Sequence, residues 1–191
     1  SVEVYGAELP DGTVDAKLIE VEHGPAGSSF VTFEPLASVS ASSYLGEAAA
    51  NTIIASFGSN LAGGIETVKS LPLPTTLGGV RVRIGNTDCG LFFVAASQIN
   101  FVIPASVADG NSVTVTVTNS NNSTTTGTIT VVRSAPGIFS AKSTGLGAAA
   151  AQTTSGGPLV NTFNPDGTER DVSAGTTAAP NVLVLYVTGI R

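Results

Sequence analysis

Three apolar segments separated by turn signals lie between residues 91 and 118. The first (LFFV, 91–94) is continuous, the second (QINFVI, 98–103) alternates large apolar side chains with other residues, and the third (VTVTV, 113–117) alternates valine with threonine. Side chains two residues apart in a strand lie on the same face, so each alternation gathers one apolar set on one side. The Ala-Asp-Gly-Asn run at 108–111 predicts a turn, because these residues tolerate tight or positive-φ backbone. The pattern predicts consecutive strands over a core of Phe, Ile and Val.

Most of the remaining chain reads as further short strands between Gly, Pro, Asn and Ser turns. We expect strands at 2–4, 14–22, 30–33, 51–57, 80–84, 129–132 and 181–190. In the strand at 80–84, apolar residues alternate with Arg81 and Arg83, which predicts that both arginines lie on the solvent-facing side. Two stretches differ: a small-residue connection at 37–52, with room for a short helical turn around 47–50, and a polar hairpin loop at 119–127. Strands about ten residues apart with turns between them indicate an all-β antiparallel sandwich.

Charge is scarce and unevenly placed. Only 12% of the residues are charged, against about 25% in an average domain. Residues 1–34 carry seven acidic side chains and one lysine, and the remainder carries seven acids and seven bases, so the net charge of −6 lies in the first 34 residues. This balance argues against nucleic acid, whose phosphates need Lys and Arg. No segment reaches the roughly 18 apolar residues that a membrane span requires, so no membrane insertion is expected.

The residue types that carry chemistry are few. Cys89 is the only cysteine, and we expect a small buried apolar residue there, with a reactive or intermolecular thiol as the alternative. His23, the only histidine, lies in a Gly/Pro-rich loop, and no G-x-S-x-G motif exists to accompany it. One His and one Cys make a zinc site improbable. We therefore expect no catalytic residue, no cofactor and no enzymatic activity.

Oxygen ligands for a calcium ion occur in one place. Asn164, Asp166 and Asp171 flank a turn at Gly167, but their spacing does not follow the EF-hand pattern, and a plain Asn-Pro-Asp-Gly turn is the alternative. Asn121 and Asn122 each begin an N-x-S/T sequon in the polar loop, which marks an exposed site for glycosylation in a secreted protein. The chain has three tyrosines and no tryptophan, which disfavours sugar stacking.

The C-terminal stretch NVLVLYVTGI (181–190) is apolar on both faces of a strand, and such a strand belongs inside a larger structure. Its backbone groups need partners, either in the same sandwich or on a neighbouring copy by strand addition. We assign Val182, Val184 and Tyr186 to this assembly strand. The N-terminal residues Val2, Val4 and Tyr5 are assigned to a second one. Head-to-tail addition that does not close would build a filament.

Five segments carry a resemblance to a known family. They are 38–62 (SVSASSYLGEAAANTIIASFGSNLA), 71–84 (LPLPTTLGGVRVRI), 91–104 (LFFVAASQINFVIP), 134–139 (SAPGIF) and 182–190 (VLVLYVTGI). In order and wording they resemble an uncharacterised C-terminal domain family of secreted acidobacterial, Solibacter-type proteins, whose members resemble the IPT/TIG class of immunoglobulin-like sandwiches. The resemblance implies export and a β-sandwich, and it supplies no catalytic residues.

Together these observations predict an antiparallel immunoglobulin-like (IPT/TIG-like) sandwich at 37–133. Residues 1–36 would form an N-terminal β arm or the tail of a preceding unit, and residues 134–191 a C-terminal β-rich extension or partial second sandwich. The expected function is that of a secreted, non-enzymatic structural or adhesive protein at the cell surface, which assembles with itself or with other cell-surface proteins. The alternative is an accessory or polysaccharide-binding module of a larger secreted protein.

Overall fold

A computed structural model of the chain describes residues 2–8, 14–22, 28–31, 35–154 and 158–190. The chain divides into two units, Ser1–Pro35 and Leu36–Arg191, which are described separately. Every regular element in the described residues is a strand, as the sequence predicted.

The first unit contains a three-stranded antiparallel sheet of order β1-β2-β3, made of β1 (Val2–Glu8), β2 (Val14–Glu22) and β3 (Ser28–Val31). The register pairs Val4 with Ile19 and Glu20 with Phe30. The register of β1 against β2 shifts between Tyr5 and Gly6, which marks a bulge. β2 lies in the centre of this sheet, so β1 and β3 are its edge strands.

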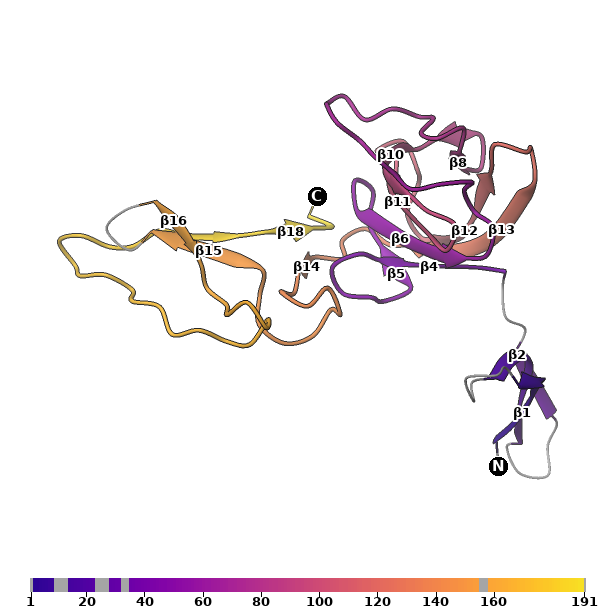
Figure 1. The fold of residues 1–191 in the computed structure, drawn as a ribbon, viewed down its shortest axis with the longest axis horizontal. Helices are drawn as coiled ribbons and strands as arrows, with labels where there is room; N and C mark the ends of the chain where they lie inside the picture. The colour runs from indigo at the N-terminus through magenta and orange to yellow at the C-terminus, as the bar shows by residue number, and fades with distance from the viewer. Residues whose placement is uncertain (1, 9–13, 23–27, 32–34, 155–157, 191) are drawn as a thin grey trace. The chain divides into compact units, whose positions relative to one another are not determined.

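The second unit is built on two five-stranded sheets (Figure 1). The first has the order β4-β6-β11-β10-β7, with β4 (Leu36–Ser40), β6 (Ile53–Gly58), β11 (Gln98–Val102), β10 (Gly90–Val94) and β7 (Glu66–Thr67). The second has the order β5-β13-β12-β8-β9, with β5 (Glu47–Ala48), β13 (Thr124–Val131), β12 (Asn111–Thr118), β8 (Arg81–Ile84) and β9 (Thr87–Asp88). All pairings within these sheets are antiparallel except that of β5 with β13.

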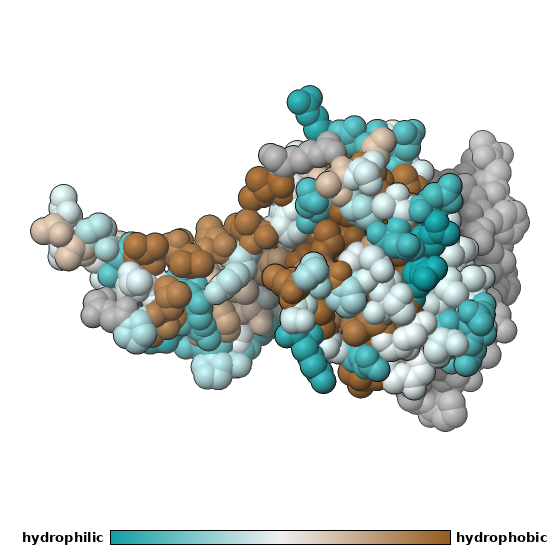
Figure 2. All heavy atoms as spheres, turned by 90° about the horizontal axis from the view of Figure 1, so that it is seen from above, coloured by the Kyte–Doolittle hydropathy of each residue, from teal (hydrophilic) through white to brown (hydrophobic). Residues whose placement is uncertain are grey.

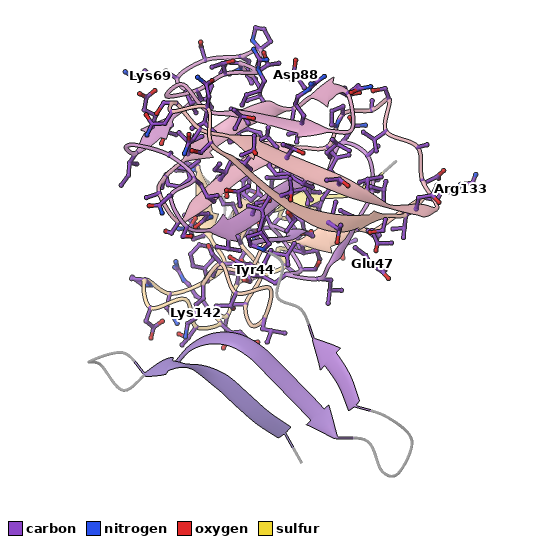
Figure 3. The ribbon with its side chains drawn as sticks, turned by 90° about the vertical axis from the view of Figure 1, so that its right-hand side faces the viewer. Tyr44, Glu47, Lys69, Asp88, Arg133 and Lys142 are labelled. Atoms are coloured by element: carbon purple, nitrogen blue, oxygen red, sulfur yellow. The ribbon has the colours of Figure 1, made fainter. Side chains whose placement is uncertain are left out.

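The core consists of the apolar sets that the alternation predicted. Ile99 and Phe101 of β11 are fully buried, while Gln98 and Asn100, which alternate with them, are only half-buried. Val115 and Val117 of β12 are buried in the same cluster as Phe101. Full burial of each large apolar side chain contributes about 1.5–3 kcal/mol, so the side chains from the two sheets hold the sandwich together. The charged side chains labelled on the sandwich, including Glu47, Lys69, Asp88 and Arg133, project from its outside (Figure 3).

Two local expectations are corrected by the structure. The short helical turn allowed at 47–50 does not form: residues 47–48 are strand β5, which pairs in parallel with β13, and Ala48 is fully buried. Partners across the sheet override the helical preference of the alanines here. The loop expected at 119–127 ends early, because β13 begins at Thr124 and only residues 119–123 form the turn.

The C-terminal extension adds two small sheets to the second unit. One has the order β16-β15-β17, with β15 (Ala151–Thr154), β16 (Leu159–Asn161) and β17 (Leu183–Leu185). The other pairs β14 (Gly137–Ile138) with β18 (Val187–Thr188). The single strand expected at 181–190 is therefore split, because the chain changes its partner from β15 to β14 at Tyr186. The extension is tied to β6 by the Ile53 backbone N–H, which donates to Thr188 Oγ1 at 3.0 Å.

Candidate binding surfaces

The C-terminal strand β17 lies at an edge of its sheet. It pairs only with β15, in a register that places Leu183 opposite Thr153 and Leu185 opposite Ala151. Among the described strands none pairs with the other edge of β17. Its outer N–H and C=O groups form an open template for a further strand.

Apolar side chains around this edge are exposed to an unusual degree (brown in Figure 2). The exposed fractions are 59% for Val182, 56% for Leu183, 43% for Leu185, 47% for Tyr186, 42% for Val187 and 61% for Ile190. We call this set the apolar edge. We expected a strand that is apolar on both faces to be buried inside a larger structure. In the described part of the chain, the side chains of the apolar edge are instead exposed. Residues 181–190 contain no charged side chain, although natural edge strands are usually protected by charge.

The residues assigned to assembly from the sequence fall on this edge and on β1. Val184 is half-buried opposite Gln152, and Val182 and Tyr186 flank it in exposed positions. The Tyr186 hydroxyl donates to Gln152 Oε1 at 2.8 Å, so the ring is anchored beside the sheet. At the other end of the chain, residues 2, 4 and 5 lie in β1, whose outer edge no other described strand covers.

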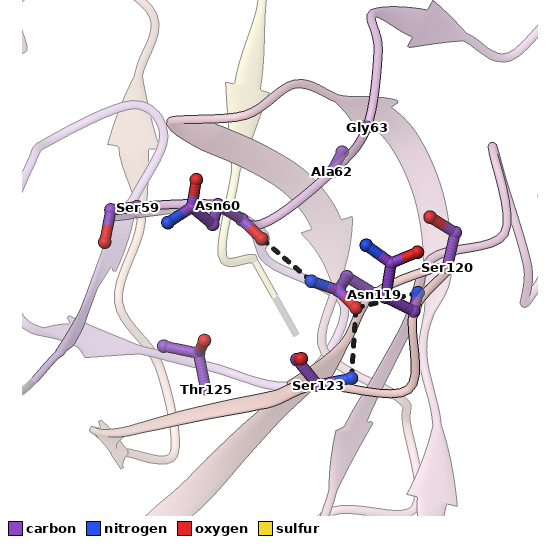
Figure 4. A pocket seen from close by; sticks show the side chains of 9 residues that line it. Ser59, Asn60, Ala62, Gly63, Asn119, Ser120, Ser123 and Thr125 are labelled. Atoms are coloured by element: carbon purple, nitrogen blue, oxygen red, sulfur yellow. Dashed lines mark hydrogen bonds between the residues drawn. The ribbon is translucent and has the colours of Figure 1, made fainter.

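An open polar groove lies beside the turn between β12 and β13 (Figure 4). Its volume is 530 Å³, and it is lined by Ser59, Asn60, Ala62, Gly63, Asn119, Ser120, Asn121, Ser123 and Thr125. The Asn119 Nδ2 group donates to the Asn60 carbonyl at 3.0 Å. Asn119 Oδ1 accepts from the backbone N–H groups of Asn121 at 2.9 Å and Ser123 at 3.1 Å. The groove therefore offers hydroxyl and amide groups on a hydrogen-bonded turn, without a charged or aromatic side chain. The sequence contained no motif for it, because its two sides are about sixty residues apart.

The two asparagines of the sequons, Asn121 and Asn122, are both exposed at the tip of this turn. Asn122 has a φ of 60°, in the left-handed region that asparagine tolerates better than most residues. The structure thus leaves both amide side chains accessible, in agreement with the exposed position expected for the two sequons.

Two arginines extend from β8 beside the same turn. Arg81 is exposed and Arg83 half-buried, while Val82 and Ile84 between and after them are buried, so the predicted alternation in this strand is confirmed. Asp88 Oδ1 lies 3.8 Å from Arg81 Nε and 3.4 Å from Arg83 Nε. One carboxylate oxygen is therefore shared by two guanidinium groups.

Two of the calcium candidates, Asn164 and Asp166, make hydrogen bonds within their own turn. Asp166 Oδ1 accepts from the Thr168 hydroxyl at 2.6 Å and from its backbone N–H at 3.0 Å. Asn164 donates through Nδ2 to the Thr168 hydroxyl and to the Glu169 carbonyl, both at 3.0 Å. These are the contacts of an Asn-Pro-Asp-Gly turn, and among the described residues no hydrogen bond or ion pair joins Asp171 to them. The Thr168 hydroxyl, followed by its backbone N–H, lowers the pKa of Asp166.

Cys89 and His23 are the other reactive residues that the sequence singled out. Cys89 is a fully buried free cysteine in the sandwich core, as expected from the sequence. Burial raises the pKa of its thiol to about 12, which suppresses the nucleophilic thiolate. His23 lies outside the described residues. Within residues 2–8, 14–22, 28–31, 35–154 and 158–190, no three His, Cys, Asp or Glu side chains are grouped to hold a metal ion. A helix long and apolar enough to cross a membrane is likewise absent from these residues.

Comparison with known proteins bears on the sandwich alone. The family model of the IPT/TIG domain matches residues 37–131, which run from β4 through β13. The sandwich is IPT/TIG-like. IPT/TIG domains are generally non-enzymatic immunoglobulin-like modules. The sandwich of this chain has two largely antiparallel sheets with a shared apolar core, as that class does. No curated protein and no solved structure gives a significant match to the chain.

Proposed function

We propose that this protein is an extracellular, non-enzymatic structural module that assembles with further copies of itself by strand addition. In this proposal the β17 edge of one copy receives the β1 edge of the next. The observation that carries it is the apolar edge, where six exposed apolar side chains surround an edge strand without a charged residue. The resemblance of the sequence to secreted acidobacterial domains supports export. A chain rich in Thr, Ser and Asn and poor in charge agrees with an extracellular location.

The driving force would be burial of apolar area together with completion of backbone hydrogen bonds. Full burial of a Leu or Val side chain contributes about 1.5–3 kcal/mol, and side chains that are now about half exposed would contribute roughly half of that. Adding a strand also satisfies N–H and C=O groups along the β17 edge. A second copy suits this edge better than a charged partner, because residues 181–190 offer no ionic contact.

The two edges differ, which determines the kind of assembly. β17 and β1 belong to different sheets in different units of the chain. Joining unlike surfaces head to tail leaves one of each unsatisfied at the ends, so the assembly grows into a filament unless the rotation closes a ring. Pairing β17 with β17 would instead close a twofold dimer.

The test uses the full-length chain, with light scattering and negative-stain electron microscopy as readouts. A Leu183→Lys/Leu185→Lys variant places charge on the β17 edge, and a Val2→Lys/Val4→Lys variant does so on β1. Leu159→Lys is the matched control, because Leu159 is 47% exposed on β16, at the opposite edge of the sheet that contains β17. Circular dichroism checks that each variant keeps its β structure.

We expect filaments from the unmodified chain and from Leu159→Lys, and monomers from each double variant alone. An equimolar mixture of the two double variants should give dimers, since each supplies one intact edge. Monomers of the unmodified chain at high concentration would reject strand addition. Closed dimers that persist in the β1 variant would reject the head-to-tail arrangement.

A second candidate function is an accessory module that binds polysaccharide. The observation that favours it is the groove of Figure 4, whose lining of amides and hydroxyls matches the hydrogen-bonding groups of sugars. Retention of the full-length protein on an insoluble polysaccharide, and its loss in an Asn119→Ala variant, would support this function.

A further inference from the structure

A smaller pocket adjoins the polar groove on the arginine-bearing side of β8. Its volume is 280 Å³, and its lining includes Arg81, Arg83, Thr118 and Asn122. Asn119 lines both depressions, so they meet at that side chain. The strand-addition surface uses none of these residues.

The charge in this pocket is only partly compensated. Arg81 and Arg83 share a single oxygen of Asp88, at 3.8 and 3.4 Å, which leaves one positive charge in excess. Arg83 Nη2 donates a hydrogen bond to the Asn86 carbonyl at 2.7 Å. For Arg81, whose side chain is 55% exposed, no hydrogen bond of the terminal nitrogens is found among the described residues. Arg81 therefore presents an accessible guanidinium fork beside the pocket.

Hydroxyl groups continue from the arginines across the outer face of this sheet. Thr118 lies opposite Arg81 in the register of β12 with β8, and Thr116 lies opposite Arg83. On the far side of β12, Thr124 and Thr126 of β13 face the same two threonines. Paired residues on neighbouring strands share one face of the sheet, so the arginines stand at the border of a threonine-covered surface.

We infer that this pocket binds the carboxylate of a uronic acid unit in an acidic polysaccharide, with Arg81 as the principal contact and Arg83 beside it. Planar guanidinium groups pair with carboxylates through two parallel hydrogen bonds, which a neutral sugar cannot provide. The amide groove beyond Asn119 would hold the neighbouring sugar units through their hydroxyls. The inference deepens the second candidate function and is independent of strand addition.

Nucleic acid fits the same pocket less well. The chain carries a net charge of −6, and the second unit has as many acidic as basic side chains. A polyphosphate needs several cations along its length, and single strands also need aromatic platforms for their bases. Two arginines beside neutral amides and hydroxyls suit a polysaccharide ligand that carries few charges and many hydroxyl groups.

The test measures binding of the full-length protein to polygalacturonate by isothermal titration calorimetry. Dextran serves as the neutral comparison and dextran sulfate as the sulfated one. Arg81→Gln should weaken binding to polygalacturonate about tenfold, the effect of losing one charge-assisted contact. Arg133→Gln, an exposed arginine outside the pocket, is the matched control and should change binding less than twofold. Asp88→Asn removes the competing carboxylate and should tighten binding severalfold.

The outcomes separate the inference from the function on which it rests. Tight binding of polygalacturonate that Arg81→Gln weakens and Asp88→Asn strengthens supports both. Equal affinity for dextran, or an Arg81→Gln variant with unchanged affinity, overturns the acidic-ligand inference and leaves polysaccharide binding standing. Binding of dextran sulfate alone overturns the assignment of a carboxylate. Binding of none of the three overturns both.

Discussion

Gly127 lies where β13 packs closely against β4 of the other sheet, and replacing it by alanine should measurably destabilise the fold. It lies in the middle of β13, opposite Val115, and is buried. A Cβ atom at this position would meet the carbonyl oxygen of Leu36 in β4, and would lie 2.8 Å from the carbonyl carbon and 3.0 Å from the Leu36 Cβ. The obstacle is backbone of the other sheet, which cannot rotate away as a side chain would.

The expected cost follows from packing and from chain entropy. Inserting a methyl group into a packed core costs about 1–3 kcal/mol, and contact with backbone puts Gly127→Ala near the upper value. Alanine reduces the entropy of the unfolded chain relative to glycine, which returns about 0.4–1 kcal/mol. The net loss is about 2 kcal/mol. In a domain of this size that corresponds to a fall in melting temperature of roughly 4–8 °C.

Thermal unfolding of the full-length chain, followed by far-ultraviolet circular dichroism, measures this difference. Gly46→Ala is the matched control, because a Cβ at Gly46 has nothing within 4 Å. Its stability should stay within about 0.5 kcal/mol of the unmodified chain. Equal melting temperatures for Gly127→Ala and Gly46→Ala would show that β4 leaves room for a Cβ atom at position 127.

Three further predictions concern individual side chains. The buried hydroxyls of Ser38 and Ser56 are 2.7 Å apart, so Ser56→Ala leaves the other hydroxyl unpaired and should cost about 1–3 kcal/mol in urea unfolding. The double alanine variant should cost less than the sum of the two single variants, and strict additivity would argue against the bond. Burial raises the pKa of the Cys89 thiol to about 12 from 9.0, so the unfolded chain loses this proton first as the pH rises. Stability that is fully present below about pH 9 should therefore fall between pH 9 and 12, by at most about 1.4 kcal/mol per pH unit, and Cys89→Ala should lack that part of the slope. Thr168→Val removes the hydroxyl that lowers the pKa of Asp166, so the pKa in an NMR titration should rise toward the ordinary value, and an unchanged pKa would contradict the assigned cause.

Predictability from sequence differed between neighbouring parts of the chain. The alternation at 98–103 was sufficient to assign Ile99 and Phe101 to the core, because a strand has only two faces and one set was plainly more apolar. Gly127 was placed at the end of the polar hairpin loop expected at 119–127. Its actual role depends on Leu36, more than ninety residues earlier, which no local pattern records.

The candidate sites divide in the same way. The apolar character of residues 181–190 was visible in the sequence, and so was the solvent-facing position of Arg81 and Arg83. The sequence did not show that Asp88 is shared between the two arginines. This contact depends on the pairing of β9 with β8. The groove at Asn119 likewise arises from contact between the β12–β13 turn and the segment that follows β6.

By itself, the sequence determined the strand-forming stretches and their apolar faces, because these depend on the period of side chains along one segment. Tertiary structure decided which strands pair, where the final apolar stretch breaks between β17 and β18, and which polar groups converge. Those outcomes depend on contacts between distant segments, and the free energy of such contacts is not contained in either segment alone.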